Sequence, residues 1–450
     1  MGGYLSYTEY KESGIEWLGE IPKHWEVWKA THGFKRIGSG TTPKSDNPLY
    51  YDGETPWVTT SELRETVITD TSQKITREAL EEYSALKLYQ KGSLAIAMYG
   101  ATIGRLGILG IDAAVNQACC VFAEPSIFDT KFFYYWLWMR RPILISLSTG
   151  GGQPNLSQDD LKQLRIPIPP LEEQRSIAHF LDYKTAQIDA LITKKETLLK
   201  KLTEKRTALI SQAVTKGCDL TVPMKDSGID WLGEIPAHWK IKRLKFVVDE
   251  IIDTPHKTAP YDDNGEFLVV RTTNVKNGRL LLDGAKFTDE KTYREWTSRA
   301  IPAPGDILFT REAPAGEACL VPIAPKSCLG QRMVLFKFNH KKYDGYFLLQ
   351  SIYSGIADEF IKSLSLGSTV SHFNMSDIGS IPLIVPPYEE QKRISFLLSE
   401  QLSFYDDQIE KVELGIKHLK EYRTALITNA VIGKIDVRDV ILELESLEAA

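Results

Sequence analysis

The chain has 450 residues, a length that predicts two or three domains. Its composition, 43% hydrophobic and 25% charged, is that of an ordinary soluble protein and excludes a disordered chain or a small disulfide scaffold. The formal net charge of −5 excludes a uniformly basic nucleic-acid binder, but not local basic surfaces. The five cysteines form no CxxC pair, so we expect a reducing compartment and a cytoplasmic protein.

The sequence predicts no targeting or membrane segment. Residues 1–10 lack the basic and apolar regions of a signal peptide. The most hydrophobic stretch, residues 132–139, is eight residues long, whereas a membrane-spanning helix needs about 20. We therefore expect a buried aromatic helix there, and no contact with a membrane.

The chain repeats itself once. SGIEWLGEIPKHW begins at Ser13 and SGIDWLGEIPAHW at Ser227, an offset of 214. PPLEEQR and PPYEEQK begin at Pro169 and Pro386, and RTALISQAV and RTALITNAV begin at Arg206 and Arg423, both at an offset of 217. A solenoid would repeat every 20–50 residues, so this is a two-copy protein. Residues 34–150 and 246–370 share almost no extended identity but have similar length, which indicates one scaffold carrying two specificities.

Each of these divergent inserts is predicted to be a mixed α/β domain. Short strands are expected over residues 93–99 and 119–122 in the first copy, and over 306–310 and 332–338 in the second. One helix is expected in each, over 131–147 and 343–365, followed by the exposed loops 148–154 and 365–369. Ser157 and Asp160 have the spacing of a capping box that opens a short helix.

Long helices are predicted after each insert, over 172–214 and 389–430. The proline pairs fit helix starts, and the glutamates after them suit the helix dipole. A helix of residues 172–214 is about 64 Å long, so it needs a surface to lie against, and the other copy's helix is the expected partner. The alternative is that each helix packs only on its own half. Apolar residues at alternating three- and four-residue steps form the predicted coiled-coil seam, which also serves for subunit docking: Ile188, Ile192, Leu199, Leu202, Leu209, Ile409, Val412, Ile416, Leu419 and Leu426.

Catalytic and cofactor motifs are missing from the sequence. There is no GxxxxGK[ST] phosphate loop, and the turn around Gly38 and Gly40 lacks the third glycine of a dinucleotide site. Val385-Pro-Pro-Tyr388 is close to the tetrad of DNA amino-methyltransferases, but valine cannot accept the hydrogen bond which that chemistry needs. The histidines form no metal motif, and the repeated His24 and His238 are interpreted as structural. We expect no catalytic residue, no metal and no bound cofactor.

Polar loops in the inserts carry the residue types that contact base edges and phosphates. Arg311 follows a predicted strand and is a candidate for a bidentate contact with guanine; the alternative is that it pairs with Glu312 or a buried carboxylate. The candidate DNA-binding residues are Thr42, Lys44, Ser45, Thr59, Ser61, Tyr99, Thr102, Arg105, Gln153 and Asn155 in the first insert, and His256, Lys257, Arg271, Thr273, Asn274, Arg311, Ser368, Thr369 and His372 in the second.

The repeated SGI[ED]WLGEIP[KA]HW openings, the GTTP and PWVTTSEL stretches, and the PP[LY]EEQ helix starts resemble the specificity subunit of type I restriction-modification enzymes. The resemblance covers residues 13–437. It implies two target recognition domains, each reading one half of a bipartite asymmetric sequence in double-stranded DNA. It also implies that the helices form an antiparallel coiled coil that sets the half-site spacing and docks methyltransferase subunits, which restriction subunits join. S-adenosylmethionine, ATP and Mg²⁺ are then expected in those partner subunits.

The predicted fold class is therefore α+β, with two mixed α/β domains joined by two long antiparallel helices. The predicted parts are the recognition domains 1–168 and 217–385, the conserved helices 169–216 and 386–434, and an acidic tail, 435–450. A coiled-coil adaptor that binds only proteins would use the same helices, but it gives no reason for two dissimilar inserts. A free-standing DNA-modifying enzyme is disfavoured by the missing motifs.

Overall fold

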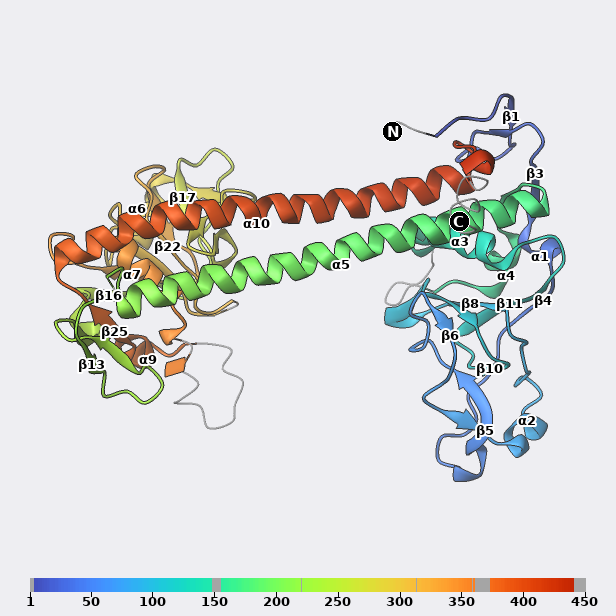
Figure 1. Cartoon of the computed structure of the whole chain (residues 1–450), viewed down its shortest axis with the longest axis horizontal. Helices are drawn as coiled ribbons and strands as arrows, with labels where there is room; N and C mark the ends of the chain where they lie inside the picture. The colour runs from blue at the N-terminus through green and yellow to red at the C-terminus, as the bar shows by residue number, and fades with distance from the viewer. Residues whose placement is uncertain are drawn as a thin grey trace. The chain divides into compact units, whose positions relative to one another are not determined.

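The computed structural model describes residues 4–147, 155–219, 221–312, 314–357, 359–360 and 373–440. The chain divides into two compact units (Figure 1). One comprises residues 1–194 and 415–450, and the other residues 195–414. Each unit therefore holds one sequence copy, the first half of the helix that follows it, and the last part of the other copy's helix.

The first unit contains a five-stranded sheet in the order β4-β11-β8-β9-β6, a three-stranded sheet β10-β5-β7, and the pairs β1-β2 and β12-β3. Its strands are β1 (Tyr10–Glu12), β2 (Glu20–Pro22), β3 (Glu26–Lys29), β4 (Phe34–Gly38), β5 (Tyr51–Val58), β6 (Val67–Ile68), β7 (Lys74–Ile75), β8 (Leu94–Ala97), β9 (Leu106–Leu109), β10 (Ala114–Val115), β11 (Cys119–Pro125) and β12 (Arg165–Ile168). Its short helices are α1 (Ala30–Gly33), α2 (Arg77–Glu82), α3 (Thr130–Leu147) and α4 (Gln158–Gln163), with 3-10 turns at Pro48–Tyr50 (η1) and Gly100–Thr102 (η2).

The second unit contains a four-stranded sheet β16-β24-β21-β22, a three-stranded sheet β20-β17-β23, and the pairs β13-β14, β15-β25 and β18-β19. Its strands are β13 (Met224–Asp226), β14 (Glu234–Pro236), β15 (Lys240–Arg243), β16 (Glu250–Asp253), β17 (Phe267–Val270), β18 (Val275–Lys276), β19 (Arg279–Leu280), β20 (Lys286–Thr288), β21 (Ile307–Thr310), β22 (Ala318–Leu320), β23 (Ser327–Leu329), β24 (Met333–Lys337) and β25 (Pro382–Val385). Its short helices are α6 (Glu290–Trp296), α7 (Gly345–Ile352) and α9 (Met375–Ser380), with 3-10 turns at Leu244–Phe246 (η3) and Thr272–Asn274 (η4).

The two inserts share one topology despite their dissimilar sequences. In the first, β11 pairs antiparallel with β4 and β8, and β10 pairs parallel with β5. In the second, β24 pairs antiparallel with β16 and β21, and β23 pairs parallel with β17. The repeated openings also correspond, since β1-β2 and β13-β14 are equivalent hairpins. The predicted duplication of an α/β scaffold is therefore confirmed.

The predicted helix over 131–147 is confirmed as α3, which buries Phe132, Phe133 and Trp136 in the first domain. The prediction of one helix over 343–365 is wrong. Helix α7 ends at Ile352, and the chain turns through Gly355 at a φ of 85°, a left-handed conformation that interrupts a helix. Helical residues resume at 356–357 and 359–360. The predicted exposed loops 148–154 and 365–369 lie outside the described residues.

Two long helices, α5 (Leu171–Lys216) and α10 (Tyr388–Val431), confirm the predicted ones. Each begins directly after its proline pair and carries two glutamates in its first turn, where they stabilise the helix N-terminus. All ten residues of the predicted seam are buried or half-buried. In the part of the chain that the structure describes, no helix is at once long and apolar enough to cross a membrane.

A buried glutamine anchors each domain to its long helix. Gln174 is fully buried; its Oε1 accepts a hydrogen bond from the Asp129 amide at 2.7 Å, and its Nε2 donates to the Ile127 and Pro169 carbonyls, each at 2.9 Å. Asp129 in turn caps the start of α3. The second copy repeats this arrangement with Gln391 and Asp344. The EEQ motif thus fixes the domain helix against the long helix.

The neighbouring glutamate makes a second repeated contact. Glu173 accepts hydrogen bonds from Trp25 Nε1 at 3.0 Å and Tyr7 Oη at 2.6 Å, and its Oε2 lies 2.8 Å from His24 Nε2. In the second copy, His238 Nε2 lies 2.8 Å from Glu390 Oε2. The structural interpretation of both histidines is confirmed: each joins the repeated opening to its long helix.

We predict that Gln174→Ala lowers the free energy of unfolding by about 2–4 kcal/mol, because it leaves buried backbone groups without partners. Gln187→Ala is the matched control, since Gln187 is exposed on the same helix and its loss should change stability by less than about 0.5 kcal/mol. Urea unfolding of both variants measures the difference. Equal stability of the two variants would contradict the anchoring role.

Candidate nucleic-acid interface

In the first domain, loops that follow several strands converge on one surface. The Gly40 amide donates to the Asn116 carbonyl at 3.3 Å, and the Asn116 amide donates to the Val58 carbonyl at 3.0 Å. The Leu156 amide donates to the Met98 carbonyl at 2.8 Å. The segments after β4, β5, β8 and β10 are thereby held side by side, and their side chains share one surface on a rigid scaffold.

Three predicted residues meet on this surface around Gln117, which the sequence analysis did not select. The Thr42 hydroxyl donates to Gln117 Oε1 at 2.5 Å. Burial raises the pKa of Tyr99, and a hydrogen bond from Gln117 opposes that rise. Tyr99 also forms a backbone bridge with Asn155. Thr42, Tyr99 and Asn155, far apart in the sequence, therefore form one cluster.

A carboxylate organises the second group of predicted residues. Thr59 donates to Glu62 Oε2 through its hydroxyl at 2.6 Å and its amide at 2.8 Å, and Ser61 lies 2.7 Å from the Thr59 hydroxyl. Ser72 donates to Glu62 Oε1 at 2.6 Å. Partial burial raises the pKa of Glu62, but the hydrogen bonds from Ser72 and Thr59 outweigh it and hold that pKa below its usual value. The carboxylate is therefore ionised and fixes the positions of both hydroxyls.

The remaining predicted residues of the first domain lie on exposed loops or turns. Lys44 and Ser45 are exposed, and the Lys44 amide is bonded to the Tyr83 hydroxyl. Thr102 lies in the 3-10 turn η2, and Arg105 is exposed just after it.

In the second domain, Arg311 lies at the centre of a network of ion pairs. It contacts Asp253 at 3.0 Å and Glu312 at 3.1 Å, and its side chain is 17% exposed. Glu312 also contacts Arg332 at 3.3 Å, and Asp253 contacts His256 at 3.0 Å. These are the pairings of the alternative interpretation, in which Arg311 binds carboxylates of its own domain. Arg332 is exposed and was not selected from the sequence.

Arg271 and Asn274 support the loop instead of facing solvent. Asn274 is 1% exposed; its Oδ1 accepts from the Arg271 amide at 3.2 Å, and its Nδ2 donates to the Leu281 carbonyl at 3.1 Å. The Arg271 guanidinium donates to the Gly284 carbonyl at 2.7 Å. Asn274 is therefore a buried residue that stabilises the loop, and its contact with DNA stays a prediction. Thr273, between them, is exposed.

Gln331 corresponds to Gln117. It follows β23 as Gln117 follows β10, at the same offset of 214 that relates the repeated openings. Its Nε2 lies 3.5 Å from the carbonyl of His256, the residue equivalent to Thr42. Both glutamines are exposed. Both inserts therefore carry a glutamine at positions that differ by 214, although the rest of their sequences diverge. This shared position is the sequence signal that identifies Gln117 and Gln331.

Lys257 is exposed beside His256. The predicted residues Gln153, Ser368, Thr369 and His372 lie outside the described residues. The described ranges contain no group of three or more His, Cys, Asp or Glu side chains placed to hold a metal ion.

The long helices exchange a repeated ion pair. Arg206 of α5 contacts Asp406 of α10 at 2.7 Å, and Arg423 of α10 contacts Asp189 of α5 at 3.0 Å. At the offset of 217, Arg206 corresponds to Arg423 and Asp189 corresponds to Asp406, so the two ion pairs are equivalent. An arginine of each copy thus binds an aspartate of the other copy, as expected for antiparallel helices.

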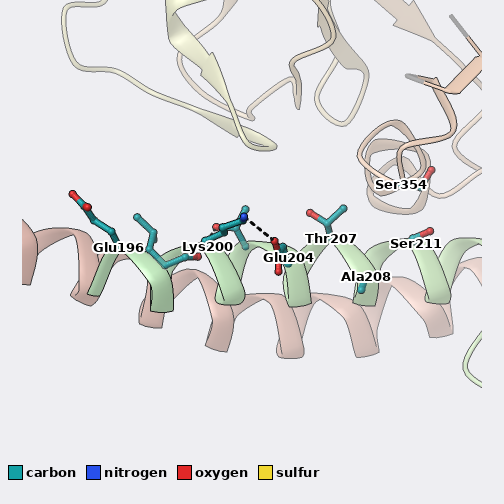
Figure 2. Close-up of a pocket in the computed structure, with 9 residues that line it drawn as sticks. Glu196, Lys200, Glu204, Thr207, Ala208, Ser211 and Ser354 are labelled. Atoms are coloured by element: carbon teal, nitrogen blue, oxygen red, sulfur yellow. Dashed lines mark hydrogen bonds and ion pairs between the residues drawn. The ribbon is translucent and has the colours of Figure 1, made fainter. Parts of the chain in front are cut away.

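Each long helix also carries a shallow groove in equivalent positions. The first, of about 650 Å³, lies along α5 and includes Ser354, which follows α7 (Figure 2). The second, of about 520 Å³, lies along α10. Five equivalent positions line both grooves: Thr203, Glu204, Thr207, Ala208 and Ser211 on α5, and Lys420, Glu421, Thr424, Ala425 and Thr428 on α10. Three of the five side chains recur unchanged and Ser211 recurs as Thr428, whereas Thr203 is replaced by Lys420, so the helices present a similar hydroxyl-bearing surface twice.

A family model described as the Type I restriction modification DNA specificity domain matches residues 22–201 and, a second time, residues 236–415. The chain belongs to this family. The two matches coincide with the two sequence copies, so the chain carries two such domains, and the resemblance inferred from the repeated openings is confirmed.

Curated relatives agree with this assignment. The MjaVIII specificity subunit of a type I restriction enzyme from Methanocaldococcus jannaschii is 24% identical over 438 residues, covering 96% of this chain and 98% of that protein. The MjaIX specificity subunit from the same organism is 25% identical over 448 residues, with the same coverage. A solved chain from work on complex assembly and conformational transition of the type I restriction-modification system has a TM-score of 0.67 at 17% identity. It covers 92% of this chain and 99% of that chain, and the likeness confirms the predicted fold class.

We predict that the two interhelical ion pairs differ in strength. Asp406 is 19% exposed and also contacts Arg279 at 2.9 Å, whereas Asp189 is 52% exposed. Asp406→Ala should lower the free energy of unfolding by about 2–3 kcal/mol because it leaves the largely buried Arg206 without its carboxylate partner, and Asp189→Ala by less than about 1 kcal/mol. Chemical unfolding of the two variants measures this. A larger loss from Asp189→Ala would refute the ranking.

Proposed function

We propose that this chain is the specificity subunit of a type I restriction-modification complex, and that each domain reads one half of a bipartite DNA target. The observation that carries the proposal is the pair of loop clusters, built on the same strand ends but from different side chains. Around Gln117 the first domain presents Thr42 and Tyr99; around Gln331 the second presents His256 and Arg332. One scaffold with two different surfaces suits an asymmetric target.

The chemistry of these clusters fits direct readout of bases. Glutamine can pair bidentately with adenine, and hydroxyl and arginine side chains bond base edges and phosphates. Fixed carboxylates such as Glu62 and Asp253 orient their neighbours, which reduces the entropy lost on binding. The net charge of −5 is compatible with this role if partner subunits supply part of the basic clamp around DNA.

The chain is proposed to be non-catalytic and to bind no cofactor. Its sequence lacks nucleotide, S-adenosylmethionine and metal motifs. Methyl transfer would belong to methyltransferase subunits with S-adenosylmethionine, and cleavage to restriction subunits with ATP and Mg²⁺. In the cell we expect the complex in the cytoplasm, where its DNA substrate lies.

The two equivalent grooves on α5 and α10 are the proposed docking surfaces for two copies of one methyltransferase subunit. A partner that binds twice needs the same side chains twice, and Glu204, Thr207 and Ala208 recur unchanged as Glu421, Thr424 and Ala425. The continuous helices would also set the spacing of the half-sites. An adaptor that binds only proteins would account for the grooves but not for the two divergent loop clusters.

We predict that Gln331→Ala relaxes recognition in one half-site and that Gln117→Ala relaxes it in the other. Each loss should be about 1–3 kcal/mol of discrimination, the value of one bidentate base contact. Methylation of a randomised DNA library by the reconstituted complex, read by sequencing, measures both half-sites separately. Gln187→Ala serves as the control and should leave both unchanged. If either glutamine variant weakened both half-sites equally, the assignment of one domain to one half-site would be wrong.

We predict that blocking one groove removes one methyltransferase subunit. Thr207→Arg places a long charged side chain in the α5 groove, and Thr424→Arg does so in the α10 groove. Native mass spectrometry of the reconstituted complex should show two methyltransferase subunits on the unmodified chain, one on each single variant and none on the double variant. Gln187→Arg, on α5 but outside the groove, should retain both. Two bound subunits on the double variant would rule out the grooves as docking surfaces.

A further inference from the structure

Five ionisable side chains meet at one end of the four-stranded sheet in the second domain. Strand β24 runs antiparallel to β16 and β21, with Val334 opposite Asp253 and Met333 opposite Thr310. Arg332, which precedes β24, therefore lies beside the last residue of β16 and the first residue after β21. The side chains form a single ionic row, with contacts at 3.0, 3.0, 3.1 and 3.3 Å, in the order His256, Asp253, Arg311, Glu312 and Arg332.

The two arginines of the ionic row have different surroundings. Arg311 is 17% exposed and uses both of its terminal nitrogens, Nη1 for Asp253 and Nη2 for Glu312. Arg332 is 47% exposed, and it contacts Glu312 at 3.3 Å through Nε. A guanidinium is a planar fork with five N–H donors, so a carboxylate at Nε leaves the donors of Nη1 and Nη2 for a ligand. Arg332 is therefore the arginine of the row that is placed to bind a ligand from solvent.

The backbone of Arg332 is held in an unusual conformation. Its φ is 71°, in the left-handed region, which is unfavourable for a residue with a side chain. Hydrogen bonds hold this turn: the Arg311 amide donates to the Arg332 carbonyl at 2.9 Å, and the Met333 amide donates to the Gly330 carbonyl at 3.3 Å. His256, at the other end of the ionic row, has a φ of 54°. Strained residues of this kind are concentrated at binding sites, so both ends of the row are candidates for contact with a ligand.

The equivalent positions of the first domain carry uncharged side chains. The strand registers relate β16, β21 and β24 to β4, β8 and β11. Ala118, in place of Arg332, is buried and does not have a left-handed backbone. A cation at this position is thus a property of the second domain, and it should affect only that domain's half of the target. In the order of the ionic row, the equivalent residues are Thr42, Ser39, Met98, Tyr99 and Ala118.

The chemistry of Arg332 favours guanine among the groups that DNA presents. Guanine is the base that offers two acceptors, N7 and O6, in the major groove, and they match two donors of an arginine. A phosphate accepts hydrogen bonds from many directions and does not need a guanidinium of fixed orientation. Exposed cations for phosphate lie beside the row: Lys257, and Arg299, whose guanidinium donates to the Asp253 carbonyl at 2.9 Å. The fixed orientation of Arg332 therefore suits a base.

We infer that Arg332 reads a guanine in the half-site of the second domain, donating through Nη1 and Nη2 to the O6 and N7 atoms. The inference rests on the proposed function, in which each domain reads one half of a bipartite target. Glu312 is a positioning residue, which holds Arg332 through Nε and does not contact the base. Arg311, enclosed by Asp253 and Glu312, holds these two carboxylates in place. Arg332 thereby takes the role for which residue type first suggested Arg311.

The first test replaces Arg332 in the reconstituted complex and reads the target by methylation of a randomised DNA library. We expect the half-site that Gln331→Ala alters to contain a guanine, and Arg332→Ala to reduce the preference for guanine at one position about tenfold or more. The other half-site should stay unchanged. Arg332→Gly should have the same effect and be at least as stable as Arg332→Ala, because glycine has no steric cost at a φ of 71°. Arg393→Ala, which removes an exposed arginine from α10, is the matched control and should leave both half-sites unchanged.

A guanine analogue, 7-deazaguanine, tests the contact itself. It pairs normally with cytosine but has a carbon–hydrogen group in place of N7, so it lacks one acceptor. Each guanine of the half-site is replaced in turn, and fluorescence anisotropy measures binding of the duplex to the complex. At one position the replacement should weaken binding to the unmodified complex about fivefold or more and leave binding to the Arg332→Ala complex unchanged. Equal losses for the two complexes at every position would overturn the inference.

Glu312→Gln tests the positioning role. Glutamine keeps the volume of the side chain but not its charge, so the preference for guanine should fall by a smaller factor than in Arg332→Ala. In the double variant, Glu312→Gln should cause no further loss, because it acts through Arg332. Additive losses in the double variant would mean that Glu312 acts on the target independently, and would overturn the positioning role.

The outcomes separate this inference from the proposed function. A complex without preference for a bipartite sequence would refute the proposed function itself. A bipartite target whose second half-site lacks guanine, or keeps its guanine preference in Arg332→Ala, would leave that function standing and overturn the inference. Equal weakening of all sequences by Arg332→Ala, with a smaller dependence on salt, would assign Arg332 to a phosphate and overturn it as well.

Discussion

The hydrogen bonds of one buried glutamine in each copy determine how the rest of this structure is built. Gln174 and Gln391 occupy the first turn of the long helices, and each bonds the backbone at the start of a domain helix. Amide side chains both donate and accept, so a single residue satisfies backbone groups of both partners. The adjacent Glu173 and Glu390 bind the histidines of the repeated openings. Each domain is thereby held to its helix by directional bonds, which fix orientation as well as proximity.

This rigid attachment explains which parts of the sequence are free to diverge. The EEQ motif and the repeated opening hold the domain in place, so the strand ends form a stable platform. The loops after these strands contribute little to the stability of the frame, and their side chains are free to change. The Thr42–Gln117 cluster and the Arg311–Asp253 network occupy equivalent platforms with unrelated chemistry. A glutamine at the same position in both is the common element, and the side chains around it differ. Specificity can change by loop substitution while the frame remains intact.

The frame was predictable from the sequence because its signals are local or repeated. The helix seam, the proline starts and the Ser157 cap follow from spacing alone, and the structure places them within a few residues of the prediction. The surface was less predictable, since burial depends on contacts that are distant in sequence. Arg311 bonds Asp253, which is 58 positions away, and Asn274 is buried by the loop that it caps. Both residues were candidates because of their type, but residue type does not indicate whether a side chain is already hydrogen-bonded within its own domain. Gln117 and Gln331 are related by the offset of 214, a signal that their residue type alone does not carry.

Equivalent clefts beside the proline pairs show how a symmetric frame can still present different surfaces. The first, of about 330 Å³, is bordered by Glu26 and Trp28, and the second, of about 300 Å³, by Lys240 and Lys242. These residues alternate along β3 and β15, so the backbone positions match, but the acidic Glu26 is replaced by the basic Lys240 and the neutral Trp28 by the basic Lys242. A partner that docks identically on both copies cannot rely on these borders, because a side chain that suits Glu26 is repelled by Lys240. It must use positions that remain the same, such as those along the long helices. A ligand that binds only one copy can use the positions that differ, such as Glu26 and Lys240. The internal repeat therefore gives two kinds of surface. Some occur in both copies and can bind the same partner twice, and others occur in one copy and can bind a ligand only once.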